Sequence, residues 1–152
     1  MNATVESPTR RARILLVEDN PADVCLTLEV FREGTAQPVI DVVNDGVEAL
    51  RYLRGDPPGA PPQRPDLILL DLNLPRMDGR ELLAVLKADP GLSAITVLVL
   101  TTSSAPSDIT RCYDLRAASV ILKPVDLQGF QRVVRSIESY WLPAAQLKSD
   151  QA

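Results

Sequence analysis

Five short apolar runs, each about the length of a β-strand, recur along the chain between longer segments of mixed polarity. They lie at 14–17, 39–43, 67–70, 97–100 and 120–122. All but the second are continuously apolar rather than alternating, which is typical of parallel strands that are covered on both faces. The sequence therefore predicts a parallel sheet with helices on both sides.

The segments between and after these runs carry apolar residues at helical spacing. They predict helices that begin at 20 or 21 and end near 33, and further helices at 45–53, 79–87, 107 to about 116, and 127–141. Asn20 suits the cap of the first helix, and Pro143 is expected to end the last one. Strand and helix thus alternate five times, which predicts a doubly wound α/β fold.

The chain has 152 residues, a length that suits one compact core. We expect a flexible N-terminal segment at 1–12, one domain at 13–142 and a C-terminal tail at 143–152. The proline-rich segment 55–65 lies inside the repeating pattern. It is therefore interpreted as an exposed insertion loop rather than as a boundary between domains.

Charge and hydropathy narrow the classes of function. The formal net charge is −4, so no overall basic field attracts nucleic acid, and direct DNA binding is not expected. No apolar run approaches the roughly 20 residues of a membrane span, and no secretory signal begins the chain. These features predict a cytoplasmic protein without membrane contact.

Acidic residues follow two of the predicted strands directly. Glu18 and Asp19 come after the first strand, and Asp71 comes after the third. If these strands are parallel neighbours, the three carboxylates converge at one edge of the sheet. Carboxylates this close repel one another unless a cation neutralises them, and Mg²⁺ prefers oxygen ligands of this kind. A magnesium site is therefore predicted.

A hydroxyl and an ammonium group are predicted at the same edge. Thr101 ends the fourth strand, and Lys123 follows the fifth. Together with the carboxylates they suit phosphoryl transfer, with Asp71 as the nucleophile and with the metal and Lys123 neutralising phosphoryl oxygens. The sequence contains no histidine, so a phosphohistidine donor has to belong to another protein.

These motifs resemble the receiver domains of two-component response regulators. The matching segments are Glu18-Asp19, the loop from Asp71 to Gly79, Thr101, and Lys123-Pro124. The resemblance implies a flavodoxin-like sheet with strand order 2-1-3-4-5. It implies that Asp71 is the phosphoacceptor and that a sensor histidine kinase is the phosphodonor.

The same resemblance assigns further roles. Asp19 would bind the metal directly, Glu18 through water, and Asn73 through its backbone carbonyl. Thr101 would be the switch hydroxyl, and the bond between Lys123 and Pro124 would be cis. Asn73 and Ser103 would tune the lifetime of the phosphorylated state.

Two positions depart from the family pattern. Val120 replaces an aromatic residue whose burial accompanies phosphorylation in many receivers, so that account of switching does not transfer. Arg116 stands where glycine is common. Neither change affects the phosphorylation chemistry.

The proline-rich insertion, the run Thr101-Thr-Ser103 and the segment Tyr140-Trp141-Leu142 resemble the phytochrome-associated branch of small receivers. This implies a light-sensing histidine kinase of the bacteriophytochrome type as donor. It also implies a homodimer with contacts at Tyr140, Trp141 and Leu142. The alternative is that Trp141 closes the core of a monomer.

No output domain fits after residue 141, so we expect signalling through a surface that another, unidentified protein binds. A phosphate sink in a phosphorelay shares all of this chemistry. A phosphorylation-independent dimeric binding module and an aspartate-dependent phosphatase belong to different classes. The phosphatase is disfavoured because Asn73, an amide, stands where such enzymes place an acid. The chain is therefore not expected to be an enzyme that turns over external substrates.

Overall fold

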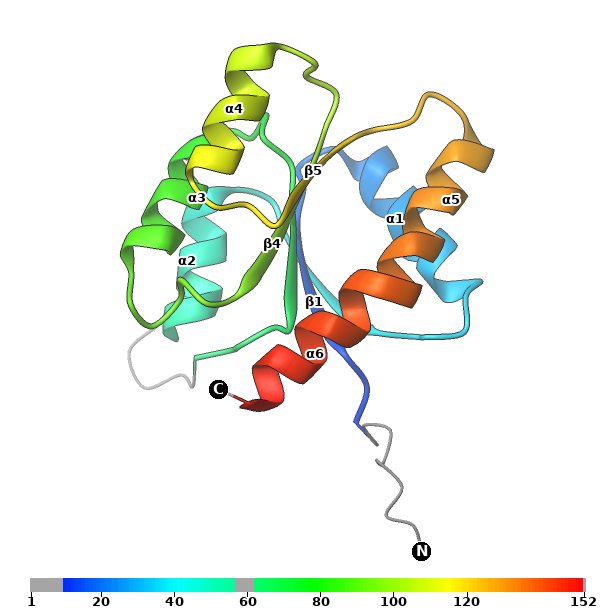
Figure 1. Ribbon diagram of the computed structural model, residues 1–152, viewed down its shortest axis with the longest axis horizontal. Helices are drawn as coiled ribbons and strands as arrows, with labels where there is room; N and C mark the ends of the chain where they lie inside the picture. The colour runs from blue at the N-terminus through cyan, green and yellow to red at the C-terminus, as the bar shows by residue number, and fades with distance from the viewer. Residues whose placement is uncertain (1–9, 57–61, 152) are drawn as a thin grey trace, which may run out of the picture.

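The computed structural model describes residues 10–56 and 62–151, in which one parallel sheet lies between two layers of helices (Figure 1). Within these residues the strands pair in the order β2-β1-β3-β4-β5, and every neighbouring pair is parallel. The predicted α/β fold and its strand order are confirmed. The strands are β1 (Arg13–Val17), β2 (Val39–Val43), β3 (Leu67–Leu70), β4 (Thr96–Thr101) and β5 (Ser119–Leu122).

The helices divide between the two faces of the sheet, with α1 and α5 on one side and α2, α3 and α4 on the other (Figure 1). Their bounds agree with the predicted segments to within a few residues, except at the C-terminal end. They are α1 (Pro21–Arg32), α2 (Gly46–Arg54), α3 (Gly79–Ala88), α4 (Pro106–Asp114) and α5 (Leu127–Ser136), followed by a π-helical turn η1 (Ile137–Trp141) and by α6 (Leu142–Gln151).

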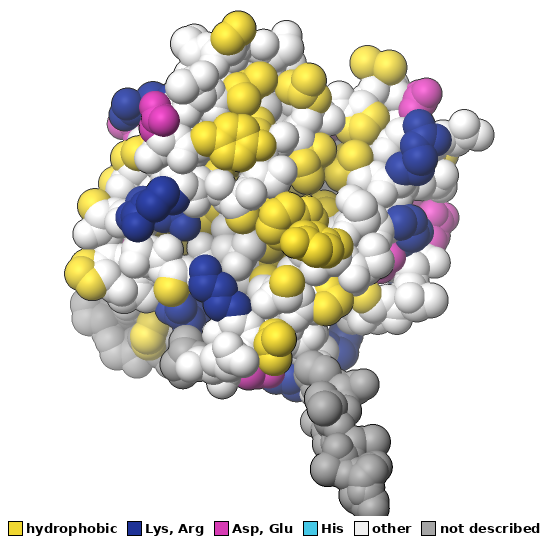
Figure 2. Space-filling view, in the orientation of Figure 1, with side chains coloured by type: hydrophobic (Ala, Val, Ile, Leu, Met, Phe, Trp, Pro, Cys, Tyr) yellow, Lys and Arg dark blue, Asp and Glu magenta, His cyan; other side chains and the backbone are white. Residues whose placement is uncertain are grey.

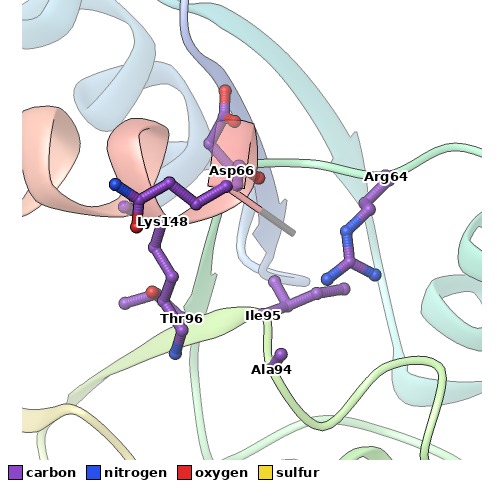
Figure 3. A pocket seen from close by; sticks show the side chains of 9 residues that line it. Arg64, Asp66, Ala94, Ile95, Thr96 and Lys148 are labelled. Carbon is purple, nitrogen blue, oxygen red and sulfur yellow. The ribbon is translucent and has the colours of Figure 1, made fainter.

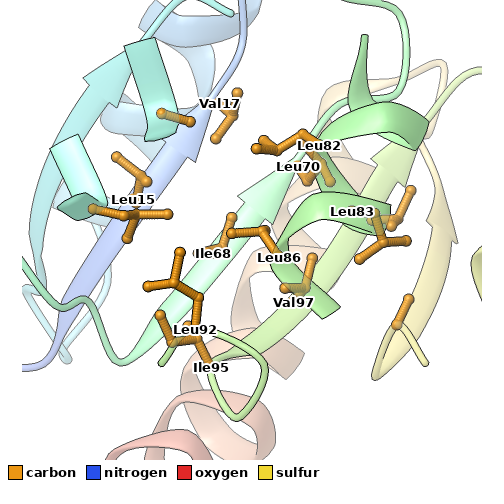
Figure 4. Close-up of a cluster of buried hydrophobic side chains, with 14 of the residues drawn as sticks. Leu15, Val17, Ile68, Leu70, Leu82, Leu83, Leu86, Leu92, Ile95 and Val97 are labelled. Carbon is orange, nitrogen blue, oxygen red and sulfur yellow. The ribbon is translucent and has the colours of Figure 1, made fainter. Parts of the chain in front are cut away.

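The continuously apolar strands feed two separate cores because successive side chains point to opposite faces of the sheet. In β1, Leu15 and Val17 pack with α2 and α3, whereas Ile14 and Leu16 pack with α1 and α5. Figure 4 shows the first of these clusters, in which leucines of α3 cover β1, β3 and β4. The sheet is thereby packed against helices on both of its faces.

The prediction that Pro143 ends the last helix is wrong. Pro143 is the second residue of α6, which follows α5 and a π-helical turn without a gap. The preceding turn is π-helical, and the N–H of Leu142 donates to the carbonyl of Ile137, five residues earlier. The chain therefore continues as a helix through Pro143 to Gln151.

Helix α6 packs on the domain instead of leaving it. Ala145 is buried in the same core as α1 and α5. The Arg10 guanidinium donates to Asp66 and to Asp150, each at 2.8 Å, and the Gln146 side chain donates to the Arg10 carbonyl at 3.1 Å. The N-terminal end of the described chain, the start of β3 and α6 are thus joined. The predicted division of the chain at residues 12 and 143 stays a prediction.

Two loop positions explain local sequence choices. Gly55 ends α2 with a φ of 80°, where glycine is favoured. Residues 57–61 of the predicted insertion lie outside the described residues. Arg116 has a φ of 65°, a left-handed conformation that accounts for the glycine common at this position in receivers.

Among the described residues, no helix is both long enough and apolar enough to cross a membrane.

Candidate functional site

The three predicted carboxylates meet at the carboxyl edge of the sheet. Strands β1 and β3 are neighbours, with Val17 opposite Leu70, so the residues that follow them emerge side by side. One carboxylate oxygen each from Glu18, Asp19 and Asp71 lies within 4.8 Å of the other two. Glu18 and Asp71 are buried, and Asp19 is exposed. This set of hard oxygen donors fits a divalent cation such as Mg²⁺.

Lys123 reaches this cluster from the end of β5. Its Nζ lies 2.8 Å from Glu18 Oε1, 3.0 Å from Asp23 Oδ2 and 3.4 Å from Asp71 Oδ2. The Lys123 backbone N–H also donates to the Thr101 carbonyl at 2.8 Å. Lys123 is therefore held both at its backbone and at its ammonium group, which lies beside the carboxylates.

Burial and charge act in opposite directions on the ionisation of this cluster. Burial alone would lower the pKa of Lys123, but its ion pairs with Glu18 and Asp23 and the charge of Asp71 raise it above its ordinary value. Burial also raises the pKa of Glu18, against the hydrogen bond from Lys123, which lowers it. Lys123 is thus positively charged throughout the physiological pH range.

Thr101 ends β4 and is fully buried. Its Oγ1 accepts a hydrogen bond from the Ser103 N–H at 3.1 Å. The Ser103 hydroxyl donates to Asp108 Oδ2 at 2.6 Å, and Arg80 of α3 binds the same carboxylate at 2.8 Å. Hydrogen bonds from Arg80 and Ser103 lower the pKa of Asp108 to about 2. The loop after β4 is therefore tied to both α3 and α4.

The loop after Asp71 leads directly into α3. The N–H of exposed Asn73 donates to Asp71 Oδ1 at 3.3 Å. Asp78 caps α3 in a capping box with Glu81. A Cβ on Gly79 would lie only 2.3 Å from the Asp71 carbonyl oxygen. Only glycine allows α3 to begin this close to the predicted nucleophile.

Asp23 is a polar neighbour of the cluster that the sequence interpretation missed. It lies in the first turn of α1, where the Asn20 side chain accepts hydrogen bonds from the N–H groups of Ala22 and Asp23. An acidic residue in the first turn of the helix that follows Glu18-Asp19 was the available signal. Acidic residues are common at such positions for helix stability alone, so the signal did not distinguish this role.

The three predicted dimer residues differ in exposure. Tyr140 is 65% exposed, but Leu142 is buried in the chain's own core, and Trp141 packs against that core while its ring meets Tyr140 edge-on. Leu142 is thus not available to a partner in this conformation. Further exposed apolar side chains include Tyr113, Leu122, Val125 and Leu127. Figure 2 shows apolar side chains gathered on the face formed by α4, β5 and the C-terminal helices.

A cavity of about 280 Å³ lies elsewhere, between α6, the α3–β4 loop and the start of β3. Figure 3 shows Arg64, Asp66 and Lys148 around it. Asp66 and Thr96 stand at the amino ends of β3 and β4, so the cavity lies at the edge of the sheet opposite to the acidic cluster. None of the predicted site residues lines it.

The acidic cluster lies outside the carboxyl ends of the strands, where doubly wound proteins bind their ligands. Its charges and hydroxyl are those of a phosphoacceptor domain. The family model of the response regulator receiver domain matches residues 14–135. The chain belongs to this family and thereby to two-component signalling, in which a histidine kinase is the phosphodonor. The individual roles predicted for the site residues stay predictions.

Relatives of known structure include phytochrome response regulators. Response regulator Rcp1 of Synechocystis sp. is 42% identical over 136 residues, covering 88% of this chain and 91% of its own. Its Mn²⁺-bound structure has a TM-score of 0.78, at 42% identity, and the match covers 86% of this chain and 94% of that one. The phosphorylated cyanobacterial phytochrome response regulator RcpA is 46% identical, with a TM-score of 0.82 and coverage of 88% and 95%. The bacteriophytochrome response regulator AtBRR is 36% identical, with a TM-score of 0.70 and coverage of 87% and 96%.

Proposed function

We propose that Asp71 accepts a phosphoryl group from a phosphohistidine of a sensor kinase. A carboxylate oxygen of Asp71 attacks phosphorus in line with the leaving nitrogen, so the P–O bond forms as the P–N bond breaks, and the imidazole leaves with its electron pair. The observation that carries this proposal is the position of the buried Asp71 carboxylate in the acidic cluster, 3.4 Å from Lys123. Lys123 neutralises phosphoryl oxygens, and the Thr101 hydroxyl donates to one of them.

The metal of this site is proposed to be Mg²⁺, held by Asp19, Asp71 and the Asn73 carbonyl, with Glu18 acting through water. When bound, Mg²⁺ neutralises carboxylate charge and binds phosphoryl oxygens. The convergence of three carboxylates supports the proposal. So does Rcp1, a relative with an Mn²⁺-bound structure. Asn73 and Ser103 are proposed to flank the water that attacks the phosphoryl group and so to tune the lifetime of the phosphorylated state.

The phosphodonor is proposed to be a light-sensing histidine kinase of the phytochrome class. This rests on the three relatives, of which RcpA and AtBRR are described as phytochrome or bacteriophytochrome response regulators. Phosphorylation then alters a surface that another protein binds in the cytoplasm. A phosphate sink uses the same chemistry and differs only in having no such partner. The chain does not turn over an external substrate, because Asn73 supplies no acid to a leaving group.

Self-association is proposed to use the exposed apolar face that includes Tyr140 and Trp141. Large apolar side chains of α4, β5, the loop after β5 and the C-terminal helices are substantially exposed, among them Tyr113, Leu122, Val125, Leu127 and Tyr140. Apolar surface of this kind is costly to leave in water. Tyr140→Glu should lower the molar mass that light scattering measures from that of a dimer to that of a monomer. An unchanged mass would contradict this interface.

The test of the phosphoacceptor is the intact mass of the protein after incubation with acetyl phosphate, with and without Mg²⁺. We expect one phosphoryl adduct that requires Mg²⁺, is absent in Asp71→Asn and persists in Asp114→Asn. Asp114 is an exposed residue at the end of α4, so this control makes the same chemical change away from the site. An adduct that persists in Asp71→Asn would refute the assignment.

A further inference from the structure

The Lys123 ammonium group contacts three carboxylates at unequal distances. The contacts with Glu18 and Asp23, at 2.8 and 3.0 Å, have the lengths of charge-assisted hydrogen bonds. The contact with Asp71, at 3.4 Å, is longer than such bonds usually are. Within residues 10–56 and 62–151, the other Asp71 oxygen accepts a single hydrogen bond, from the Asn73 N–H at 3.3 Å. Both oxygens of the predicted nucleophile are therefore only weakly engaged.

Asp23 differs from the other partners of Lys123 because it stands outside the metal-ligand cluster. That cluster contains Glu18, Asp19 and Asp71. Asp23 comes from α1, and its side chain is 41% exposed, whereas that of Lys123 is 12% exposed. The Asn20 cap fixes its backbone, and the positive end of the helix dipole favours its negative charge.

This difference matters because a cation and the ammonium group compete for the same oxygens. A metal that enters the cluster uses an Asp71 oxygen directly and Glu18 through water, and Lys123 contacts both of these carboxylates. Without another anionic partner, the ammonium group would spend its time on those oxygens and oppose the metal by charge repulsion. Asp23 offers it a partner that the metal does not use.

We propose that Asp23 is a positioning residue that holds the Lys123 ammonium beside the metal ligands and leaves the Asp71 oxygens free for the divalent cation. This proposal rests on the metal and phosphoacceptor site proposed above. It assigns to α1 a part in the site besides the packing of its apolar face. It also predicts effects of opposite sign on two steps, since the ammonium group that Asp23 releases is then available to the phosphoryl group.

The first measurement is the affinity of the unphosphorylated protein for Mg²⁺, obtained by calorimetry. Asp23→Asn should weaken Mg²⁺ binding about fivefold, which corresponds to the loss of about 1 kcal/mol from a partly exposed ion pair. Glu29→Gln is the matched control, because Glu29 is an exposed acidic residue of α1 that pairs with Arg32. It should leave the affinity unchanged.

The second measurement separates positioning from a general loss of negative charge. In a Lys123→Met background, Asp23→Asn should change Mg²⁺ affinity less than twofold, since no ammonium group remains to be held. A fivefold effect that persists in this background would overturn the proposal, because Asp23 would then act on the cation directly. An unchanged affinity in the single variant would overturn it as well.

The third measurement is the rate of phosphoryl adduct formation from acetyl phosphate at saturating Mg²⁺. Asp23→Asn should increase this rate, because Lys123 is no longer shared with a carboxylate outside the cluster. Loss of both Mg²⁺ affinity and rate in Asp23→Asn would contradict the proposal, which predicts effects of opposite sign on the two. Absence of Mg²⁺ binding and of adduct in the native protein would instead refute the proposed function itself.

Discussion

Replacing Gly79 with alanine tests how closely the fold and the predicted nucleophile depend on each other. The added Cβ would lie 2.3 Å from the Asp71 carbonyl oxygen and 2.6 Å from Leu72 Cα. Both are backbone atoms, which cannot rotate away as the end of a side chain can. To reach an ordinary van der Waals distance, the start of α3 and the backbone of Asp71 would have to move apart by roughly 1 Å.

Overpacking of this kind typically costs about 1 to 3 kcal/mol. Alanine favours a helix over glycine by up to about 1 kcal/mol in a helix interior, but less at the first helical residue, where Gly79 stands. We therefore expect Gly79→Ala to lower the free energy of unfolding by about 2 kcal/mol. With an ordinary dependence on urea, the midpoint of unfolding would fall by about 1 M.

Gly91→Ala is the matched control for this substitution. The nearest atom to a Cβ at Gly91 is the Asp89 Oδ1, a side-chain atom at 3.3 Å, so its effect should stay within about 0.5 kcal/mol. Urea unfolding followed by circular dichroism measures both variants. Gly79→Ala should also slow adduct formation on Asp71 under conditions where it remains folded. Equal stabilities of the two variants would refute the argument.

Two further predictions concern ionised carboxylates. Because hydrogen bonds from Arg80 and Ser103 hold the pKa of Asp108 at about 2, Arg80→Met should move its titration midpoint upwards toward the ordinary value of about 3.9, as measured by ¹³C NMR. Burial raises the pKa of Asp66, but hydrogen bonds from Arg10 and the Arg13 N–H lower it by a larger amount, so the pKa lies below its ordinary value. Asp66→Asn should therefore destabilise the fold by about 1 to 2 kcal/mol at pH 7. Since a lowered pKa stabilises the fold above the unfolded value of about 3.9, this difference should shrink as the pH falls below about 4, as urea unfolding at pH 7 and pH 3 would show.

The sheet and the acidic cluster were predictable from sequence for the same physical reason. Continuous apolar runs indicate strands buried on both faces, and parallel strands bring their carboxyl ends to one edge. Glu18, Asp19 and Asp71 each follow such a run within two residues. Their convergence therefore required only the correct pairing of β1 with β3, without knowledge of any side-chain conformation.

Contacts between side chains of distant elements were less accessible. The ion pair of Asp23 with Lys123 joins residues 100 positions apart. Its geometry depends on how α1 packs against the sheet. Leu127 matches the apolar stripe of α5 but is 53% exposed, because the stripe begins before the helix reaches the core. Pro143 misled because its position within a turn, rather than its identity, decides whether it ends a helix.

The structure also shows where in the molecule the net negative charge is concentrated. The chain carries a formal charge of −4, which by composition alone only disfavours nucleic acid. Four carboxylates and one ammonium group meet at the carboxyl edge of the sheet, so a formal charge of −3 is concentrated there and the remainder of the protein is nearly neutral. A concentration of like charge in a half-buried site costs free energy that a divalent cation relieves. The charge of this protein is therefore better understood as a property of its candidate metal site than as a property of its surface.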